Sequence, residues 1–419
     1  MAPLRIAVAG AGTAGLAAAA FLARDGHDVR LFERFAEPRP IGAGLMLQPT
    51  GLACLALLDL DERAIERGCI VSGIDGRTVR GARIFDVSYG DLAPHLFGLG
   101  IHRGVLFGLL YDEVRRLSVP IAAATEISHS RPLPGGRVLV DAADKEHGPF
   151  DLVVDGTGQR SPLRAGEVRV RVDRPYPYGA LWGIVDMPDT WAHTQKLAQV
   201  YDGCHLMVGV LPVGRGPDNA RPLAALFWSL RVRDHEAWQQ AGLADWKARV
   251  LAAWPEAAAF VVQIRNLEQM TFASYADVVL QERHADRLVF VGDSGRVTSP
   301  QLGQGANMAL IDAAMLSACL RDALSVNAAL ADYAERRRAH TRFYSLASRW
   351  LTPFFQSDSR LAALVRDAAF PIAGRVPYVQ REMVRTLAGM KTGLFSHLDP
   401  GIWHARYALR PLSAAGGPT

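Results

Sequence analysis

A glycine-rich turn at residues 10–15 constrains the fold of this chain more than any other feature. The turn follows a short apolar strand predicted at residues 5–9 and precedes an alanine-rich helix predicted at residues 16–24. A second predicted strand, at residues 29–32, ends on Glu33. Strand, glycine turn, helix and strand in this order predict a dinucleotide-binding βαβ unit and therefore a Rossmann-type α/β domain.

Each residue of the turn has a separate physical task in such a unit. Gly10 allows the tight turn, Gly12 lets a pyrophosphate approach the backbone, and Gly15 lets the helix pack on the strand. Thr13 and Ala14 lie in the turn just before the helix, whose first N–H groups and positive dipole end face the phosphates. We therefore expect these five residues to contact the nucleotide.

Glu33 stands about twenty residues after the turn, which is the usual place for an acidic residue that binds the ribose hydroxyls. Arg34 follows it and is a second candidate contact with the nucleotide. The fingerprint by itself leaves NAD and FAD open, because both molecules contain the same ADP half.

Composition predicts an ordinary globular protein that occupies the cytoplasm. The chain has 419 residues, of which 49% are hydrophobic and 21% are charged, and its formal net charge is +4. We expect no nucleic-acid partner from so modest a charge. The four cysteines are scattered without metal-ligand spacing, so we expect buried free thiols in a reducing compartment. The apolar N-terminus is predicted to be a strand instead of a signal peptide.

Two further segments contain glycine or arginine where a ligand could lie. Gly44 and Leu45 belong to a glycine-rich stretch at residues 41–49, where the backbone can lie against a flat ligand; an amphipathic helix is predicted to follow at residues 50–58. Arg103 stands at the entrance of another predicted helix, within reach of a ligand in the crevice.

Two more turns follow predicted strands of the same sheet. The first, at residues 155–164, is a second glycine-rich turn. The second begins with Asp293 after a buried strand at residues 287–291 and continues into a glycine loop that opens a long helix. The carboxyl ends of parallel strands meet at one edge of a sheet, so all these turns should face one crevice. Asp293 can bind a ribityl hydroxyl, and this third piece favours FAD. The cofactor contacts that we expect from the glycine loop are Gly303, Gly305, Ala306 and Asn307.

The whole chain resembles the class A FAD-dependent monooxygenases of the p-hydroxybenzoate hydroxylase fold, most closely the branch that contains the ubiquinone-biosynthesis hydroxylases. The residues that carry the resemblance are Glu33, the Gly42-Ala43-Gly44 segment, Arg103, the turn at 155–164, Asp293, Pro300, Gly303, Gly305 and Asn307.

The resemblance implies a Rossmann-type FAD-binding domain, an inserted, mainly antiparallel β-sheet substrate domain and a C-terminal helical region. The predicted segments are 1–70, 101–175 and 271–330 for the FAD-binding domain, 71–100 and 176–270 for the substrate domain, and 331–419 for the helical region.

The same resemblance implies a reaction. NAD(P)H would reduce bound FAD, the reduced flavin would form a C4a-hydroperoxide with O2, and this species would hydroxylate an aromatic, quinone-precursor or polyketide-like small molecule. No metal is implied. An epoxidase or double-bond reductase of the same fold is one alternative, and a flavin-binding protein without turnover is another.

Two positions depart from the family pattern. Arg296 stands where the family motif has histidine, and Thr157 stands where the middle motif has aspartate. Asp155 supplies a carboxylate two residues earlier. The middle motif is implicated in both FAD and NAD(P)H handling, so these departures leave the docking of the reductant open.

Polar and aromatic residues of the inserted sheet are our candidates for contact with the substrate. His205 is the candidate catalytic residue, because it shares a strand face with Met207 and would then look into a cavity. The other substrate-facing candidates are Tyr178, Trp182, Tyr201, Trp228 and Pro300.

The C-terminal helical region offers one candidate contact outside the active site. Its basic residues lie beside Trp350, Phe354 and Phe355 and favour peripheral contact with an anionic membrane. A helical cover over the core is the alternative reading. No segment is apolar for long enough to span a bilayer.

Overall fold

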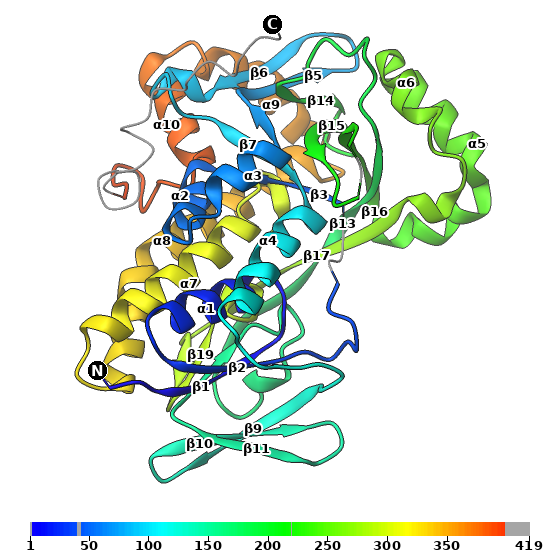
Figure 1. Ribbon diagram of the computed structural model, residues 1–419. Coiled ribbons are helices and arrows are strands. Elements are labelled where there is room, and N and C mark those ends of the chain that lie inside the picture. Colours follow the sequence, from blue (N-terminus) through cyan, green and yellow to red (C-terminus); the bar gives the residue numbers. More distant parts are fainter. Residues whose placement is uncertain (1, 40–42, 219, 399–419) are drawn as a thin grey trace, which may run out of the picture.

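A six-stranded, mostly parallel sheet forms the nucleotide-binding part of the fold (Figure 1). The computed structural model describes residues 2–39, 43–218 and 220–398. The strand order is β18-β19-β12-β1-β2-β8. Its strands are β1 (Arg5–Ala9), β2 (Asp28–Phe32), β8 (Ile121–Ala122), β12 (Leu152–Asp155), β18 (His284–Ala285) and β19 (Leu288–Phe290).

The register of this sheet brings the predicted ligand turns together. Ala9 pairs with both Phe32 and Asp155, and Asp155 pairs with Phe290. The four strands therefore end level with one another, and the turns after β1, β12 and β19 start from the same edge. The convergence that we predicted for these turns is confirmed.

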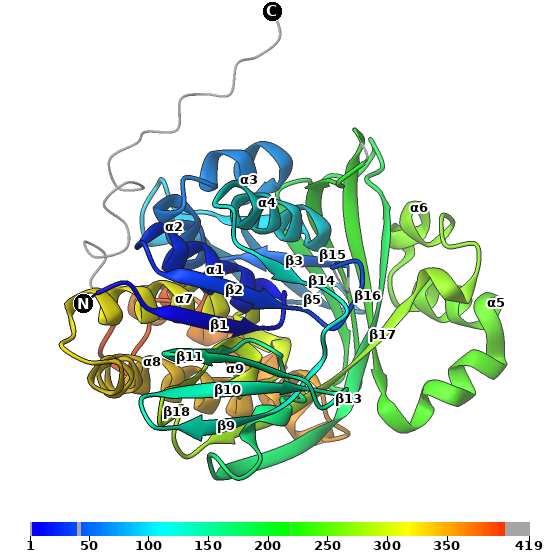
Figure 2. The same ribbon diagram turned by 60° about the horizontal axis from the view of Figure 1, so that its bottom comes forward.

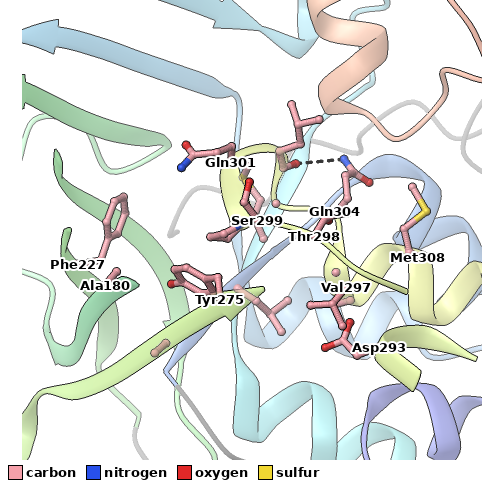
Figure 3. Close-up of a pocket in the computed structure, with 18 of the residues that line it drawn as sticks. Ala180, Phe227, Tyr275, Asp293, Val297, Thr298, Ser299, Gln301, Gln304 and Met308 are labelled. Atoms are coloured by element: carbon pink, nitrogen blue, oxygen red, sulfur yellow. Dashed lines mark hydrogen bonds between the residues drawn. The ribbon is translucent and has the colours of Figure 1, made fainter. Parts of the chain in front are cut away.

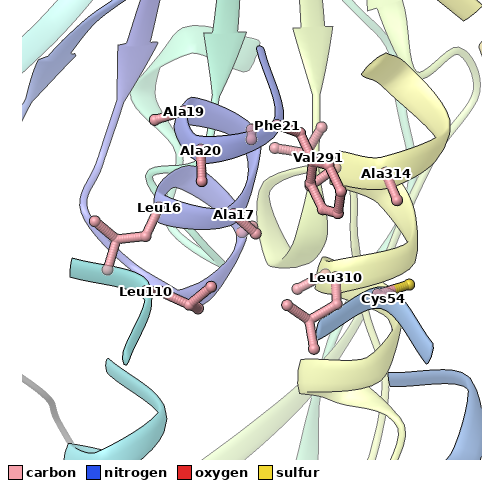
Figure 4. Packing of buried hydrophobic residues seen from close by; sticks show 14 of the residues in the cluster. Leu16, Ala17, Ala19, Ala20, Phe21, Cys54, Leu110, Val291, Leu310 and Ala314 are labelled. Carbon is pink, nitrogen blue, oxygen red and sulfur yellow. The ribbon is translucent and has the colours of Figure 1, made fainter. Parts of the chain in front are cut away.

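Helices α1 (Thr13–Arg24), α4 (Arg103–Arg116) and α7 (Gly305–Asp322) pack together against the six-stranded sheet. Alanines on α1 let α7 approach closely, and Figure 4 shows Ala17 and Phe21 beside Leu310 and Ala314. Close packing of small side chains fixes the start of α7 relative to the turn at residues 10–15.

Smaller elements surround this core. The helix predicted at residues 50–58 is found, but it is buried almost all round instead of amphipathic, because it packs against α7. The remaining elements here are α2 (Pro49–Leu57), α3 (Asp61–Arg67), the sheet β3-β7-β4 of β3 (Gly44–Leu47), β7 (Gly98–His102) and β4 (Cys69–Val71), and the sheet β11-β10-β9 of β9 (Ile127–Leu133), β10 (Gly136–Asp141) and β11 (Glu146–Phe150).

An eight-stranded sheet forms the second large layer, in the order β20-β17-β13-β16-β15-β14-β5-β6. All neighbours in it are antiparallel except β14 and β5. Its strands are β5 (Gly73–Thr78), β6 (Arg83–Ser88), β13 (Val170–Asp186), β14 (Lys196–Asp202), β15 (Leu206–Arg215), β16 (Pro222–Arg231), β17 (Thr271–Leu280) and β20 (Arg296–Val297).

The two faces of the eight-stranded sheet have different neighbours. Leu226 and Trp228 of β16 point toward α5 (His235–Ala253) and α6 (Ala258–Val261), in a core rich in tryptophan. Phe227 lies between them in sequence and points to the opposite face. Figures 1 and 2 show α5 and α6 on one side of this sheet and the rest of the molecule on the other.

Three helices complete the described chain: α8 (Val326–Phe355), α9 (Arg360–Ala373) and α10 (Pro377–Leu387). The helical C-terminal region is confirmed up to residue 398; residues 399–419 lie outside the described part. Trp350 is 75% exposed, whereas Phe355 is buried against Tyr201. The prediction that Phe355 could face a membrane is therefore wrong, because the aromatic core of the sheet covers it.

The fold class that we predicted, α/β with an inserted, mainly antiparallel sheet, is confirmed. The exact segment boundaries stay a prediction. β17 falls within segment 271–330, which we predicted for the FAD-binding domain, but it belongs to the eight-stranded sheet. Three of the cysteines are buried and Cys69 is half-buried, and all four are free thiols. Among the described helices, none is long and apolar enough to cross a membrane.

Candidate active site

The turn after β1 leaves no room for side chains at two of its three glycines. Gly10 has a φ of +93°, and a Cβ on Gly15 would lie 1.9 Å from the carbonyl oxygen of Gly10. A Cβ on Gly12 would instead meet no atom closer than 4.0 Å. Gly10 and Gly15 are therefore required by the fold, while the open side of Gly12 is free for the approach of a phosphate.

Glu33 closes this turn from the end of β2. Its carboxylate accepts hydrogen bonds from the backbone N–H of Ala11 at 2.7 Å and of Phe35 at 3.0 Å. The side chain is buried, and the bonds fix its position beside the start of α1. Arg34 is exposed, and its guanidinium lies over the ring of Phe35 at 4.7 Å from the centroid.

In the middle turn, Asp155 holds the backbone together. Its Oδ1 accepts from the backbone N–H of Thr157 at 2.9 Å and from the Thr157 hydroxyl at 2.6 Å, and its Oδ2 accepts from the Ser161 hydroxyl. Burial raises the pKa of Asp155, and these hydrogen bonds oppose that effect. The carboxylate therefore serves the turn, and Thr157 is its partner.

Arg164 connects the middle turn to the third one. Its Nε donates to the carbonyl oxygen of Ser294 at 2.7 Å, and its Nη2 donates to that of Asp293 at 2.8 Å. The Ser294 hydroxyl in turn donates to the carbonyl oxygen of Asp155 at 2.5 Å. Arg164 therefore fixes the backbone at Asp293 through its carbonyl oxygens and makes no hydrogen bond to the Asp293 carboxylate.

A cavity of about 530 Å³ lies between the six-stranded and the eight-stranded sheets. Figure 3 shows Phe227 and Ala180 on the eight-stranded sheet, Asp293 and Gln304 across the cavity from them, and Tyr275 between. We call the first side the sheet wall and the second side the loop wall. The loop wall consists of residues 292–304 and the first turn of α7.

The loop wall carries the charged groups that a flavin nucleotide requires. The Asp293 carboxyl opens onto the cavity; burial raises its pKa, while Arg103, Arg296 and Arg164 act in the opposite direction. Arg103, at the start of α4, also lines the cavity, and burial lowers its pKa although Asp293 opposes this. A carboxylate in this place can accept from a ribityl hydroxyl.

The first turn of α7 supplies the complementary donors. Gly305 and Ala306 line the cavity, and the first N–H groups of a helix have no intrahelical acceptor. Such a helix start favours a phosphate or the electron-rich edge of a flavin. Gly303, immediately before it, has a φ of +61°, which only glycine adopts readily. Ala43, Gly44 and Leu45 also line the cavity.

The side chain of Asn307 is bonded inside the protein, whereas the cofactor contact that we predicted for the N–H groups near it stays a prediction. Its Oδ1 accepts from the backbone N–H of Gln48 at 2.8 Å, and its Nδ2 donates to the carbonyl oxygens of Gly303 at 3.0 Å and Met46 at 3.3 Å. The side chain is completely buried and does not line the cavity. It ties β3 to the start of α7, so it shapes the cavity instead of touching its contents.

The sheet wall is aromatic and apolar. Trp182 and Phe227 lie side by side, with ring centroids 4.8 Å apart. The indole Nε1 of Trp182 donates to the Tyr275 hydroxyl at 2.9 Å. Burial raises the pKa of Tyr275 to about 12, so this hydroxyl keeps its proton at neutral pH.

Two of the six predicted substrate-facing residues, Trp182 and Pro300, line the cavity. Trp228 lies on the opposite face of the sheet, because its neighbour Phe227 is the residue that pairs with Trp182. His205 is exposed in the turn before β15, with a side chain 51% accessible, so the strand alternation assumed for it does not apply. The expectation that it faces a cavity is wrong.

The two remaining candidates are tyrosines whose surroundings take them away from the cavity. Tyr201 shares a face with Met207, but Phe355 and the guanidinium of Arg366 cover it. Tyr178 is buried at an irregularity of β13, where its hydroxyl donates to Asp358 at 2.5 Å.

Sequence reasoning missed Tyr275 and Phe227. The alternation of apolar residues along β17, at positions 272, 276, 278 and 280, is a strand signal that would have placed Tyr275 on a sheet. Phe227 lies inside a strand that we predicted, but only the register with β13 distinguishes it from Trp228.

A buried charge cluster lies behind the loop wall. Asp312 on α7 accepts from the backbone N–H of Gly292 at 2.9 Å and from Arg337 Nε at 2.7 Å, and it pairs with Arg283. Burial alone would raise the pKa of Asp312, but Arg283 and Arg337 lower it to about 2. Burial and these two like charges lower the pKa of Arg296 to about 9, and its Nε donates to Ser345 at 2.5 Å.

These features together fit FAD. The open backbone at Gly12 and the start of α1 suit a pyrophosphate, Glu33 lies where an adenosine ribose would be, and Asp293 opens onto the space that a ribityl chain would cross. Among the described residues, no group of three or more His, Cys, Asp or Glu side chains could hold a metal ion.

Comparisons with known proteins agree with this geometry. The model of the FAD binding domain family matches residues 4–344. The 3-amino-4-hydroxybenzoate 2-monooxygenase of Streptomyces cremeus is 30% identical over 325 residues, which are 76% of this chain and 78% of the relative. The 2-heptyl-3-hydroxy-4(1H)-quinolone synthase of Pseudomonas aeruginosa is 29% identical over 337 residues, 75% of this chain and 80% of the relative.

Solved structures share the fold. The Klebsiella pneumoniae protein HpxO, solved with FAD and uric acid, superposes with a TM-score of 0.80 at 21% identity, over 93% of this chain and 98% of that one. The particular closeness to the ubiquinone-biosynthesis branch stays a prediction. The family match and the relatives establish that the chain belongs to the FAD binding domain family and is a class A FAD-dependent monooxygenase.

Proposed function

We propose that this monooxygenase uses NADH or NADPH as its reductant and hydroxylates an aromatic small molecule, of the quinone-precursor or polyketide-like kind. One observation carries the proposal: a single cavity has the groups that we expect to bind the flavin on its loop wall and the aromatic pair Trp182 and Phe227 on its sheet wall. When bound, FAD supplies the electron transfer and the oxygen chemistry, and the protein supplies binding, orientation and a dry site.

The loop wall would orient the cofactor. Asp293 would accept from the ribityl chain, and the first N–H groups of α7 would face the flavin ring, whose negative charge on reduction a helix start stabilises. Pro300 lies in the loop between these two groups and lines the cavity. We expect the ring to lie between this loop and β3.

The sheet wall would hold the substrate ring. Tyr275 accepts its hydrogen bond from Trp182, so its own proton is left for an oxygen of the substrate. The rings of Trp182 and Phe227 offer flat apolar contact. Burial of this wall would also keep water from the reacting atoms, where it would otherwise release hydrogen peroxide.

The names of the relatives support an aromatic substrate. Those reported above act on, or make, substituted rings: an aminohydroxybenzoate and a hydroxyquinolone. A further relative, from Pseudomonas fluorescens, is a 6-hydroxynicotinate 3-monooxygenase. A ring that carries an oxygen substituent is the feature that these compounds share, and it matches the donor that Tyr275 offers.

The experiment that tests the proposal measures coupled turnover. Purified FAD-loaded protein would be given NADH or NADPH and a panel of phenols, quinolones, quinone precursors and alkenes, while NAD(P)H oxidation, O2 uptake and peroxide are followed. We expect at least one aromatic compound to stimulate NAD(P)H oxidation and to gain one oxygen atom from ¹⁸O2 by mass spectrometry.

Other outcomes select the alternatives. If an alkene gives an epoxide, the proposed reaction is epoxidation instead of hydroxylation. If a saturated product forms under nitrogen, the reaction is reduction of a double bond. A flavin that neither NADH nor NADPH ever bleaches would contradict the proposed reductant and favour a flavin-binding protein without turnover. Tyr275→Phe is the matched variant, because it removes the proposed donor and keeps the ring; we expect a raised KM with FAD content unchanged.

A further inference from the structure

The sheet wall contains no ionised side chain among the described residues that form it. Strands β5 and β13 to β17 contribute aliphatic, aromatic, amide and hydroxyl side chains to the cavity, and the only titratable one is Tyr275. Because burial raises the pKa of Tyr275 to about 12, this group is neutral at physiological pH. The wall that receives the substrate therefore offers no countercharge to an anionic substituent.

The cations of the cavity come from outside these strands. Arg103, at the start of α4, lies near both Asp293 and Tyr275; burial lowers its pKa, and these two groups act to raise it, Asp293 more strongly. Arg283 pairs with Asp312. Arg296 belongs to β20, which β17 and β13 separate from β16. Three strand spacings amount to about 14 Å. A ring in contact with Phe227 would therefore lie three strands away from the backbone of Arg296, whose Nε donates to Ser345 on α8.

An ionised carboxylate that lay against Phe227 and the apolar side chains beside it, away from Arg103, would lose its hydration without gaining a partner. Burial of an unpaired charge is among the most unfavourable events in protein interiors. Amide side chains such as Gln199 can donate hydrogen bonds but carry no charge. This part of the wall therefore favours an uncharged ring and substituent, and Tyr275 can bind a neutral ring oxygen.

The apolar part of the wall continues sideways past the aromatic pair. From Phe227 on β16 the lining passes to Leu211 on β15, Leu197 on β14 and Ile74 on β5. These four strands are consecutive neighbours in the sheet, so the apolar row crosses three spacings, or about 14 Å. This distance exceeds the width of one aromatic ring, which leaves part of the row for a substituent.

We propose that the substrate is an uncharged aromatic molecule with an apolar substituent, the ring against Trp182 and Phe227 and the substituent along β15, β14 and β5. The inference rests on the proposed function, since it concerns the same cavity, and it names the class of substrate within it. A ring oxygen would be the one polar group that the sheet wall recognises, through Tyr275.

Ligand binding to the oxidised FAD enzyme tests the inference without turnover. The probes are 4-hydroxybenzoate and its methyl, butyl and hexyl esters, and 4-quinolone-3-carboxylate with 2-methyl- and 2-heptyl-4-quinolone. Perturbation of the flavin absorption spectrum at pH 7.5, under nitrogen and without NAD(P)H, gives each Kd. We expect the neutral compounds to bind at least tenfold more tightly than the acids.

Chain length gives the second readout. Burial of a methylene contributes about 0.8 kcal/mol, which at RT of about 0.59 kcal/mol corresponds to roughly a fourfold lower Kd per added CH2. Acids that bind as tightly as their neutral counterparts on both scaffolds, or affinities that do not rise with chain length, would overturn the inference. So would tight binding of an acid that Arg296→Met or Arg103→Met abolishes while FAD is retained.

A variant at Leu197, the third residue of the apolar row, tests where the substituent lies. Leu197 is only half-buried, so Leu197→Ser should fold, and we expect it to reduce the hexyl-to-methyl affinity ratio severalfold. Leu361→Ser on the exposed surface of α9 is the control and should keep the ratio. An unchanged ratio in Leu197→Ser would contradict the placement. If the esters perturb the flavin but nothing stimulates O2 uptake, the proposed function fails and this inference stands.

Discussion

Substitution of Asn307 by aspartate should weaken the joint between β3 and α7 while keeping the shape of the side chain. The retained Oδ1 can still accept from Gln48 N. The new oxygen, however, replaces an amide that donates to the carbonyl oxygens of Gly303 and Met46, at 3.0 and 3.3 Å. Three oxygens would then face one another in a site that has no access to water.

The size of the effect follows from these contacts. A buried polar group left without its partner costs about 1–3 kcal/mol, and two carbonyls lose their donor. Relaxation is restricted, since even a Cβ on Gly51 would lie 2.1 Å from Asn307 Oδ1. We expect the free energy of unfolding to fall by about 3 kcal/mol. For a cooperative unit of roughly 150–250 residues this lowers the midpoint temperature of unfolding by roughly 6–12 °C.

The pH dependence of Asn307→Asp separates this explanation from a general loss of packing. Burial should raise the pKa of the new carboxyl in the folded state, so the penalty grows as pH rises above its unfolded value near 3.9. Protonation restores one donor. The variant should therefore lie closer to the wild type at pH 5.5 than at pH 8.

Thermal unfolding by circular dichroism at both pH values, with the flavin-to-protein absorbance ratio, measures these effects. Asn266→Asp is the matched control, because Asn266 Oδ1 accepts from Gln269 N at an exposed helix cap, where aspartate serves equally well. An unfolding midpoint and a flavin content of Asn307→Asp equal to those of the control at pH 8 would refute the reasoning.

Three further predictions concern the same site. Gly15→Ala should abolish FAD retention in the absorbance ratio, because its Cβ would lie 1.9 Å from Gly10 O, whereas Gly108→Ala, whose Cβ meets nothing within 4 Å, should retain FAD. Asp312→Asn should cost about 3–5 kcal/mol in denaturant unfolding, since it leaves buried guanidinium groups unpaired. In the wild type the pKa of Asp312 is lowered to about 2, so its contribution is complete above the ordinary value near 3.8 and is lost as pH falls toward 2; acid titrations of the two proteins should differ in that window. The pKa of Tyr275 is raised to about 12, so ligand affinity that depends on its proton should stay flat between about pH 6 and 10, and Tyr275→Phe should lower it roughly fivefold, as expected for one hydrogen bond.

The nucleotide-binding half could be predicted from sequence because its signals are local. The glycines at residues 10–15, Glu33 and Asp293 stand at fixed distances from strand ends, and a strand end in a parallel sheet has a known position relative to the ligand. The structural bonds of the Asn307 side chain could not be predicted, because two of its backbone partners, Met46 and Gln48, are more than 250 residues away in the sequence.

The substrate side depends on information that is not local. Phe227 and Trp228 are equivalent candidates in sequence, and only the pairing of Phe227 with Trp182 decides which of them faces the cavity. His205 illustrates the opposite error, because a turn that extends one residue further removes it from the alternation. In the turn at residues 155–164, the carboxylate stands at Asp155, where it accepts hydrogen bonds from Thr157 and Ser161. A comparison of motifs shows only that Thr157 departs from the family pattern and does not reveal these hydrogen bonds.

Strands β13 and β17 have a mechanical consequence for the enzyme. β13 covers 17 residues, and β17 pairs with it from Val170 to Trp182, with a shift of register between Pro175 and Gly179 (Figure 1). Together they run from the flavin side of the cavity to the sheet wall. An irregularity in a paired strand bends it locally, so we expect any relative movement of the two halves to occur at residues 175–179. Such a movement would change the distance between the flavin and the sheet wall, whereas a movement of α10, which borders the cavity with Leu387, would leave that distance unchanged.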